Sequence, residues 1–211
     1  MSGKKPEKQP SSRLVVGITG ASGVIYGIRL LDALTDLGVE SHLAISKPGE
    51  MTIGYETALS PRDVAAKAAH VYAIGDIAAP IASGSFRTGG MVVAPCSVRT
   101  MSEIATGVTT NVLTRAADVT LKERRPLVLL VRETPLHVGH LRTMTQLAEM
   151  GAIIMPPLPA FYAMPKTMSD MVDQMVGRVL DVLGYDWPVV KRWGEDLAKG
   201  RRKAKPRPAK R

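Results

Sequence analysis

The sequence predicts an α/β protein with a doubly wound parallel sheet, and two observations support this class. Apolar runs rich in β-branched residues alternate with segments of helical periodicity, and the first run passes into a glycine-rich turn that a helix follows at once. The apolar runs, each followed by a polar turn and a helix-like stretch, are residues 14–18, 39–45, 91–94, 126–131 and 152–155. Parallel strands joined by helices produce this alternation.

The turn after the first run is Thr19-Gly20-Ala21-Ser22-Gly23, and it opens a helix-like segment at 24–37. Backbone N–H groups at a helix N-terminus favour an anion such as a phosphate. The spacing G-x-x-G-x-x-G, and the Ser46 that ends the second run, differ from the G-x-G-x-x-G and acidic residue of an NAD site. The lysine and hydroxyl of an NTPase P-loop are also missing. The turn therefore predicts an anion site of neither kind.

Helical periodicity is clearest in two segments, 24–37 and 168–183. In the first, Ile25, Ile28, Leu31 and Leu34 recur at three-residue steps. In the second, apolar residues recur at three- and four-residue steps, and its methionines are expected to serve packing rather than cofactor binding. From residue 186 onward we expect a short C-terminal extension of the same domain.

Length and composition predict one domain, residues 13–198, between basic tails at 1–12 and 199–211. With 45% hydrophobic residues the chain can bury a core, and no apolar run is long enough to cross a bilayer. Residues 199–211 hold eight Lys or Arg, and residues 1–13 hold four against one Glu, so the tails account for the net charge of +9. We expect disordered, solubilising tails, and nucleic acid is not an expected partner.

The single cysteine, Cys96, excludes an intramolecular disulfide and fits a reducing compartment. The lysine-bearing N-terminus lacks the apolar core of a secretory signal. We therefore expect a cytoplasmic protein. Because Cys96 follows an apolar strand, we expect it to fill space in the core rather than act as a nucleophile.

Hydroxyl groups, backbone donors and arginines follow the carboxyl ends of the predicted strands, where open α/β sheets bind their ligands. They are Gly20, Ala21 and Ser22, then Ser46 and Lys47, then Ser97, Val98, Arg99 and Thr100, and last Arg132, Glu133 and Thr134. We expect these residues to converge on one rim of the sheet. Glu133 has two interpretations, an ion pair or loop cap and a catalytic carboxylate.

The densest charge lies between Arg115 and Arg125, in a segment that also holds Asp118, Lys122 and Glu123. Such a run commonly forms a solvated helix end, because cations are favoured at a helix C-terminus. A ligand site is the alternative. The residue pattern by itself leaves both interpretations open.

An ordered set of motifs between Arg13 and about Glu195 resembles the UbiX-type flavin prenyltransferases. Each motif is weak alone, whereas the ordered set is specific. The motifs are GITGASG at 17–23, ASGS at 82–85, PCS at 95–97, RAAD at 115–118, LKERRPL at 121–127, RETPLH at 132–137 and PAFY at 159–162.

The resemblance implies a flavodoxin-like, Rossmann-like three-layer sandwich that binds FMN at the subunit interfaces of a dodecamer. It implies a metal-independent transferase that joins the dimethylallyl group of dimethylallyl monophosphate to N5 and C6 of reduced FMN. The product would be the prenylated FMN that UbiD-type decarboxylases require. The expected partners are thus further copies of the chain, the allylic phosphate and, through the product, a decarboxylase; a membrane is not among them.

The resemblance also assigns site residues in three overlapping sets. The implied FMN contacts are Gly20, Ala21, Ser22, Ser46, Ser97, Val98, Arg99, Thr100 and Arg132. The implied dimethylallyl phosphate contacts are Arg115, Lys122, Glu133, Tyr162 and Arg178, with Trp193 as a candidate aromatic wall. The implied catalytic residues are Ser22, Glu56, Lys122, Glu133 and Tyr162. In this scheme the cations hold the departing phosphate, while Ser22 and Glu56 handle a proton near N5.

Two other classes stay open. A related FMN-dependent cysteine decarboxylase would share the fold, but it uses a histidine base early in the chain, whereas His42 falls within a predicted strand. The charged segment 122–125 also favours prenyl transfer. The second alternative is a non-catalytic flavin carrier, or a polyanion-binding protein that acts through the basic tail 199–211.

Overall fold

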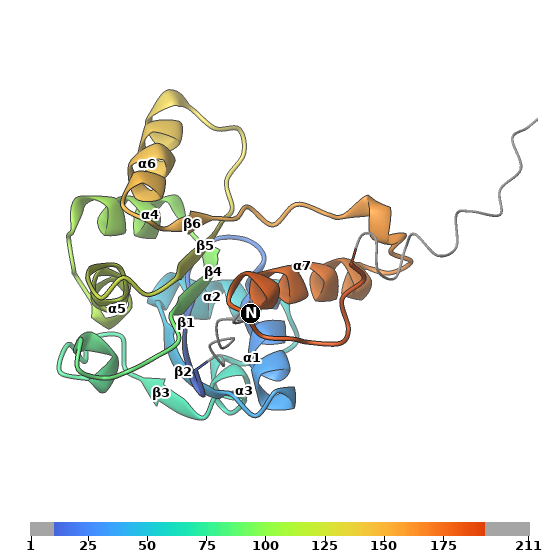
Figure 1. The fold of residues 1–211 in the computed structure, drawn as a ribbon, viewed down its shortest axis with the longest axis horizontal. Coiled ribbons are helices and arrows are strands. Elements are labelled where there is room, and N and C mark those ends of the chain that lie inside the picture. The colour runs from blue at the N-terminus through green and yellow to red at the C-terminus, as the bar shows by residue number, and fades with distance from the viewer. Residues whose placement is uncertain (1–10, 193–211) are drawn as a thin grey trace, which may run out of the picture.

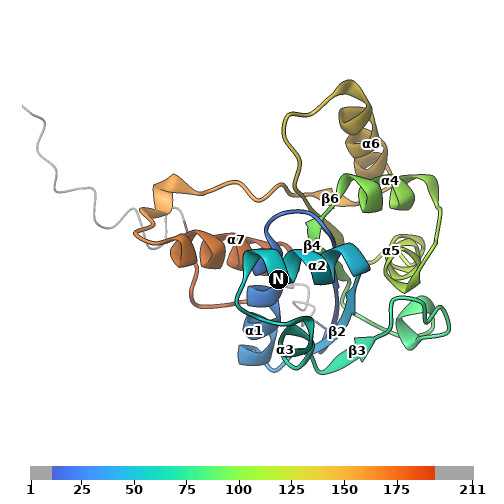
Figure 2. The ribbon, with the colours of Figure 1, turned by 180° about the vertical axis from the view of Figure 1, so that it is seen from behind.

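The computed structural model describes residues 11–192, which form three layers (Figure 1; Figure 2). Six strands build one parallel sheet in the order β3-β2-β1-β4-β5-β6. The strands are β1 (Arg13–Ile18), β2 (Glu40–Ile45), β3 (His70–Tyr72), β4 (Met91–Cys96), β5 (Leu127–Val131) and β6 (Ile153–Ile154). Because the chain winds outward from β1 in one direction and from β4 in the other, the predicted doubly wound, flavodoxin-like α/β class is confirmed.

Helices cover both faces of this sheet. They are α1 (Val24–Asp36), α2 (Lys47–Glu56), α3 (Pro61–Ala65), α4 (Val98–Thr106), α5 (Val112–Lys122), α6 (Val138–Glu149) and α7 (Met168–Val182), with 3-10 turns η1 (Pro80–Ala82) and η2 (Phe161–Ala163). Helices α1 and α7 pack together on one face, and α4 and α5 lie on the other (Figure 1). Among residues 11–192, no helix has the length and apolar character needed to cross a membrane.

Alternate side chains of β1 enter two separate cores, as the two-residue period of a strand requires. Val16 packs with α1 and α7, whereas Val15 packs with α4 and α5. The segment after α7 returns to the first of these cores, where Trp187 and Val190 are buried. The hydroxyl of Tyr185 donates to the carbonyl oxygen of Ser11 at 2.8 Å and thereby ties this segment to the chain before β1.

The predicted helices at 24–37 and 168–183 are confirmed, each one residue shorter at its C-terminal end. Strand β3 was not predicted, because it spans three residues at the sheet edge and lacks a buried apolar run. Most of the two predicted tails, the last residues of the predicted domain and the candidate Trp193 lie outside the described residues.

Candidate active site

A cavity of about 620 Å³ opens at the carboxyl edge of the sheet, over the ends of β1, β2, β4 and β5. Its wall includes all nine positions that the family resemblance assigns to FMN, together with Glu133. The convergence expected from the strand ends is therefore present within a single chain. Contact of these nine residues with FMN is a proposal that this convergence supports.

Two hydroxyl-capped helices begin at this cavity. The Ser46 Oγ accepts a hydrogen bond from the Gly49 N–H at 3.1 Å and starts α2, and the Ser97 Oγ accepts from the Thr100 N–H at 3.2 Å and starts α4. The side-chain caps satisfy one N–H of each helix. Beyond the capped N–H, the first turn of α4 has the N–H groups of Val98 and Arg99, whereas that of α2 has only the N–H of Lys47, because Pro48 has none. Two positive helix ends at one cavity make it suited to an anion.

Thr19 holds the turn after β1 against the turn after β4. Its hydroxyl donates to the Pro95 carbonyl oxygen at 2.7 Å and accepts from the Ser97 N–H at 2.8 Å. The Thr19 side chain is almost fully buried, so both bonds are shielded from water. This pair of bonds fixes the spacing between two sides of the cavity wall.

Glycine is required at position 20 because α2 passes very close to the first turn. A Cβ atom added to Gly20 would lie 2.3 Å from the Cβ of Pro48, well inside van der Waals contact. Because Gly20 has no side chain, Pro48 can approach it and form part of the same wall.

Glu56 occupies the N-terminus of α1, which corrects the expectation of open N–H groups at this turn. Its Oε2 accepts hydrogen bonds from the N–H groups of Gly23 at 2.8 Å and Val24 at 3.1 Å. A carboxylate at a helix N-terminus is favoured by the helix dipole. The anion-binding capacity predicted for this helix end is therefore largely taken by the chain's own carboxylate, and α2 and α4 keep theirs.

A second cavity of about 790 Å³ adjoins the first and shares Ser22 and Arg132 with it. Glu56 also lies on its wall. The remaining wall is mainly apolar and comes from α1 and the first turns of α7; it includes Ile25, Tyr26, Met168, Met171 and Val172. The pair of cavities thus combines a polar, helix-capped compartment with an apolar one.

Most residues assigned to the allylic phosphate lie apart from the first cavity within one chain. Lys122 is the last residue of α5, about 16 Å along the helix from the N-cap residue Asn111, which borders the cavity. Its ammonium pairs with the carboxylate of Glu123, and the guanidinium of Arg115 pairs with Asp118 at 2.6 Å.

Arg178 and Tyr162 also lie off the walls of both cavities. Arg178 lies in the second half of α7 and pairs with Asp181 at 2.6 Å. Tyr162 lies in η2, on the segment that runs from β6 outward, away from the sheet, to the start of α7 (Figure 1). Glu133 is the exception, because it lines the first cavity together with the residues assigned to FMN. The single chain therefore does not bring the five phosphate-binding candidates together.

Burial shifts the pKa of two further side chains, Cys96 and His42. Cys96 ends β4 and is fully buried, and this burial raises the pKa of its thiol to about 12. Such a thiol is protonated at neutral pH, so the expectation of a core-filling residue is confirmed. His42 lies within β2 and is buried, and desolvation lowers its pKa despite the nearby carboxylate of Glu40.

The fold and the two cavities define an α/β flavin-binding protein, and the family model described as Flavoprotein matches residues 2–180. The flavin prenyltransferase UbiX of Thauera aromatica is 54% identical over 193 residues, covering 90% of this chain and 100% of the relative. The chain belongs to the UbiX family of flavin prenyltransferases, as its motifs indicate.

Two solved structures agree with this assignment. The crystal structure of AnUbiX in complex with FMN and dimethylallyl pyrophosphate superposes with a TM-score of 0.85 at 50% identity, covering 86% of this chain and 96% of that chain. The dodecameric FMN-dependent UbiX-like decarboxylase from Escherichia coli O157:H7 superposes with a TM-score of 0.84 at 49% identity, covering 86% and 98%.

Proposed function

We propose that this chain is a flavin prenyltransferase, which joins the dimethylallyl group of dimethylallyl monophosphate to N5 and C6 of reduced FMN. One observation carries the proposal: the nine positions that match the family's flavin contacts line one cavity of the chain. The identity of 54% to a curated prenyltransferase over nearly the whole chain supports the same activity. The product is proposed to serve a UbiD-type decarboxylase.

The first cavity suits FMN in both volume and chemistry. Its volume of about 620 Å³ lies within the range of pockets that hold cofactors, roughly 300–1,000 Å³. The N-termini of α2 and α4 and the guanidinium of Arg99 provide donors for a phosphate. Reduced FMN, when bound, supplies the nucleophilic N5 and C6 positions. Ser22 and Glu56 are proposed to orient the flavin and to accept the proton that leaves C6.

The second cavity is proposed to hold the dimethylallyl chain. Its mainly apolar wall shields an allylic cation from water, which would otherwise add to it. Ser22 and Arg132 border both cavities, so the two ligands would meet beside these residues. Breaking the allylic C–O bond leaves negative charge on the departing phosphate, and arginine and lysine side chains stabilise that charge.

Neighbouring copies of the chain are proposed to supply Arg115, Lys122, Tyr162 and Arg178. Each of the three cations is about half exposed and pairs with a carboxylate on or next to its own helix. Exposed pairs of this kind contribute only about 0–1 kcal/mol, so exchange of the carboxylate for a substrate phosphate costs little. The proposed assembly is a dodecamer, as in the related Escherichia coli structure.

Exposed apolar side chains support this assembly. They lie on α6 and on the segment before α7, and they include Val138, Leu141, Leu158, Phe161 and Met164. Both elements project from the sheet in Figure 1. Apolar surface that protrudes in this way is commonly covered by a partner. A cytoplasmic location is proposed in addition, because the one cysteine is free and buried.

The direct test is anaerobic incubation of the protein with reduced FMN and dimethylallyl monophosphate, followed by mass spectrometry of the flavin. We expect the flavin to gain one dimethylallyl group. Lys122→Ala should bind FMN normally and slow the transfer by about 100- to 1,000-fold, the usual effect of removing one charge-stabilising donor. Lys67→Ala removes another lysine that pairs with a carboxylate and serves as the control. A flavin of unchanged mass with the wild-type protein contradicts the proposal.

A further inference from the structure

A cluster of two histidines and one glutamate lies at the opposite edge of the sheet from the two cavities. Glu40 begins β2, His42 follows it two residues later on the same face, and His70 on β3 is the register partner of His42. The cluster and Ser46 thus lie toward opposite ends of β2, roughly 13–20 Å apart along the strand. The proposed prenyl transfer does not use these three side chains.

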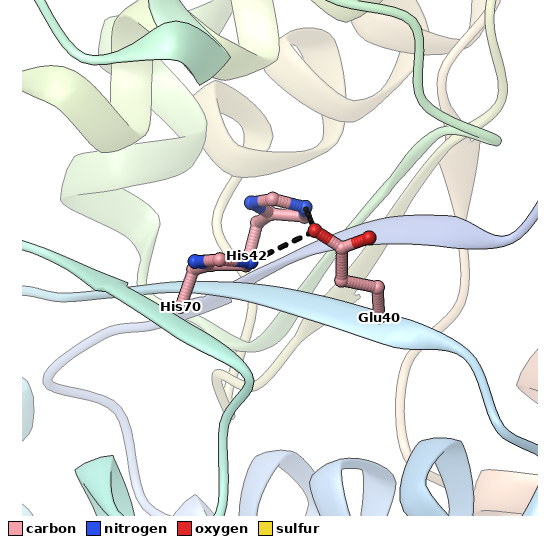
Figure 3. Close-up of side chains that lie close together, drawn as sticks. All are labelled: Glu40, His42 and His70. Carbon is pink, nitrogen blue, oxygen red and sulfur yellow. Dashed lines mark ion pairs between the residues drawn. The ribbon is translucent and has the colours of Figure 1, made fainter.

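One carboxylate oxygen faces both imidazole rings. Glu40 Oε1 is 3.3 Å from His42 Nε2 and 2.8 Å from His70 Nε2, and the three atoms all lie within 4.8 Å of one another (Figure 3). Ligand atoms arranged tetrahedrally around zinc at about 2.0–2.1 Å are about 3.4 Å apart. The rings of His42 and His70 are stacked, with centroids 4.8 Å apart and planes 13° apart, so one ring must turn before both Nε2 lone pairs can point at one ion.

His42 carries the strongest indication of a missing ligand. Only 2% of this residue is exposed, and within residues 11–192 its Nε2 has no hydrogen bond of acceptable geometry, although Glu40 Oε1 is near. A buried polar nitrogen without a partner is costly. A metal ion placed between Nε2 and the carboxylate satisfies it.

The surroundings hold the candidate ligands as metal sites do. The Nδ1 of His42 is 2.8 Å from the Tyr72 hydroxyl oxygen, which can accept a hydrogen bond from the Nδ1–H and so favour the tautomer whose Nε2 lone pair is free for a metal. Arg13 Nε donates to Glu40 Oε2 at 3.2 Å and leaves Oε1 facing the rings. Phe86 packs its ring against the edge of His42, while His70 is about half exposed and leaves access for an ion and a water ligand.

We propose that Glu40, His42 and His70 bind a zinc ion that fastens the edge strand β3 to β2. Two imidazole nitrogens and one carboxylate oxygen form a set typical of zinc sites, and they do not suit magnesium or calcium, which take oxygen ligands. The ion has a structural role here, since it lies away from both cavities. The proposal is independent of the prenyl transfer.

The test uses cobalt(II) as a spectroscopic substitute for zinc, with the full chain loaded with FMN and free of any histidine tag. We expect one Co²⁺ per chain, visible absorption bands of a four- or five-coordinate ion, displacement by Zn²⁺, and a higher Tm when Zn²⁺ is present. His70→Asn should weaken binding by at least tenfold and abolish the rise in Tm. Tyr72→Phe should weaken binding by about 10- to 100-fold, because it removes the hydrogen bond that orients His42.

His140→Asn is the matched control, because His140 stacks on His137 in the other histidine pair of the chain. This variant should bind Co²⁺ as the wild-type protein does. Circular dichroism and FMN binding verify that each variant is folded. The proposal is overturned if the wild-type protein binds no Co²⁺, if His70→Asn binds it equally well, or if His140→Asn loses as much affinity as His70→Asn does.

Discussion

The cavity proposed for FMN and the residues proposed for the allylic phosphate differ in how the chain assembles them. All nine flavin positions meet at the carboxyl edge of one sheet, where turns and helix starts are fixed by Thr19, Ser46 and Ser97. Of the five phosphate positions, Glu133 alone lies on that cavity wall among the described residues, while Lys122 and Arg178 lie on distant helix segments. The fold of one chain thus completes the first group and leaves the second incomplete.

The difference indicates that the first group depends on the fold of one chain and the second on the assembly of several copies. Sheet topology places strand ends together in any folded copy of the chain, so the cavity proposed for FMN forms within each chain. Lys122 at the end of α5 and Arg178 in the second half of α7 line neither cavity of their own chain, and we propose that they reach a cavity where another copy presents them. Transfer activity should therefore depend on assembly much more strongly than flavin binding does.

The largest expected effect comes from mixing two inactive variants. Glu133→Gln and Lys122→Ala should each lower turnover by about 100- to 1,000-fold. When the two chains are co-expressed, roughly a quarter of the sites in mixed oligomers should receive both native residues from different copies and regain activity. Turnover of the purified mixed oligomer measures this recovery.

A second pair provides the control for that experiment. Glu133→Gln with Arg132→Ala should show no recovery, because both residues line the cavity of the same chain. Recovery of turnover in this pair, or no recovery in the first pair, would contradict the proposal that Lys122 and Glu133 of one site come from different copies.

A smaller effect is expected when the in-chain cavity itself is distorted. The added methyl group of Gly20→Ala would collide with Pro48 and displace α2, and overpacking of this kind costs about 1–3 kcal/mol, or roughly 5- to 150-fold in FMN affinity. Gly54 lies on α2, as Pro48 does, but has open space around it, so Gly54→Ala should leave FMN affinity unchanged. Fluorescence titration with FMN compares the two, and equal affinities would show that Gly20 is not needed.

The smallest effect concerns the start of α7, which carries Arg178. Hydrogen bonds from the backbone of Lys166 and from Thr167 hold the pKa of Asp170 below its usual value. A lowered pKa means that the charged form stabilises the fold above about pH 4, and that this contribution is lost as the pH falls through the folded-state value.

The corresponding change is Asp170→Asn, which keeps an acceptor and removes the charge. At pH 7 it should lower Tm by a few degrees relative to Glu149→Ala, an exposed carboxylate on α6. Scanning calorimetry between pH 3 and pH 7 measures the difference, which should shrink toward the acid end. A difference that stays constant with pH would assign the effect to packing and not to charge.

The sequence was sufficient for the doubly wound fold and for the flavin cavity, because apolar runs and the polar residues after them are local signals. It was insufficient for β3, a strand of three residues at the sheet edge that pairs with β2 and in which His70 and Val71 are exposed. The cap from Glu56 to Gly23 was also missed, since it joins positions far apart in the chain. The roles of Lys122 and Arg178 came from family resemblance alone, because the hydrophobic pattern of a helix does not show which exposed surface another copy of the chain will cover.

The carboxylate that closes the start of α1 has a consequence for how a ligand can enter. A phosphate placed against Gly23 would meet the like charge of Glu56, whereas one placed against α2 or α4 would not. A ligand with one anionic end and one uncharged end is therefore expected to bind in one orientation, with its anionic end at α2 or α4 and its uncharged end toward Gly23. We expect a crystal structure with FMN to show the phosphate far from Gly23, and the reverse placement would refute this polarity.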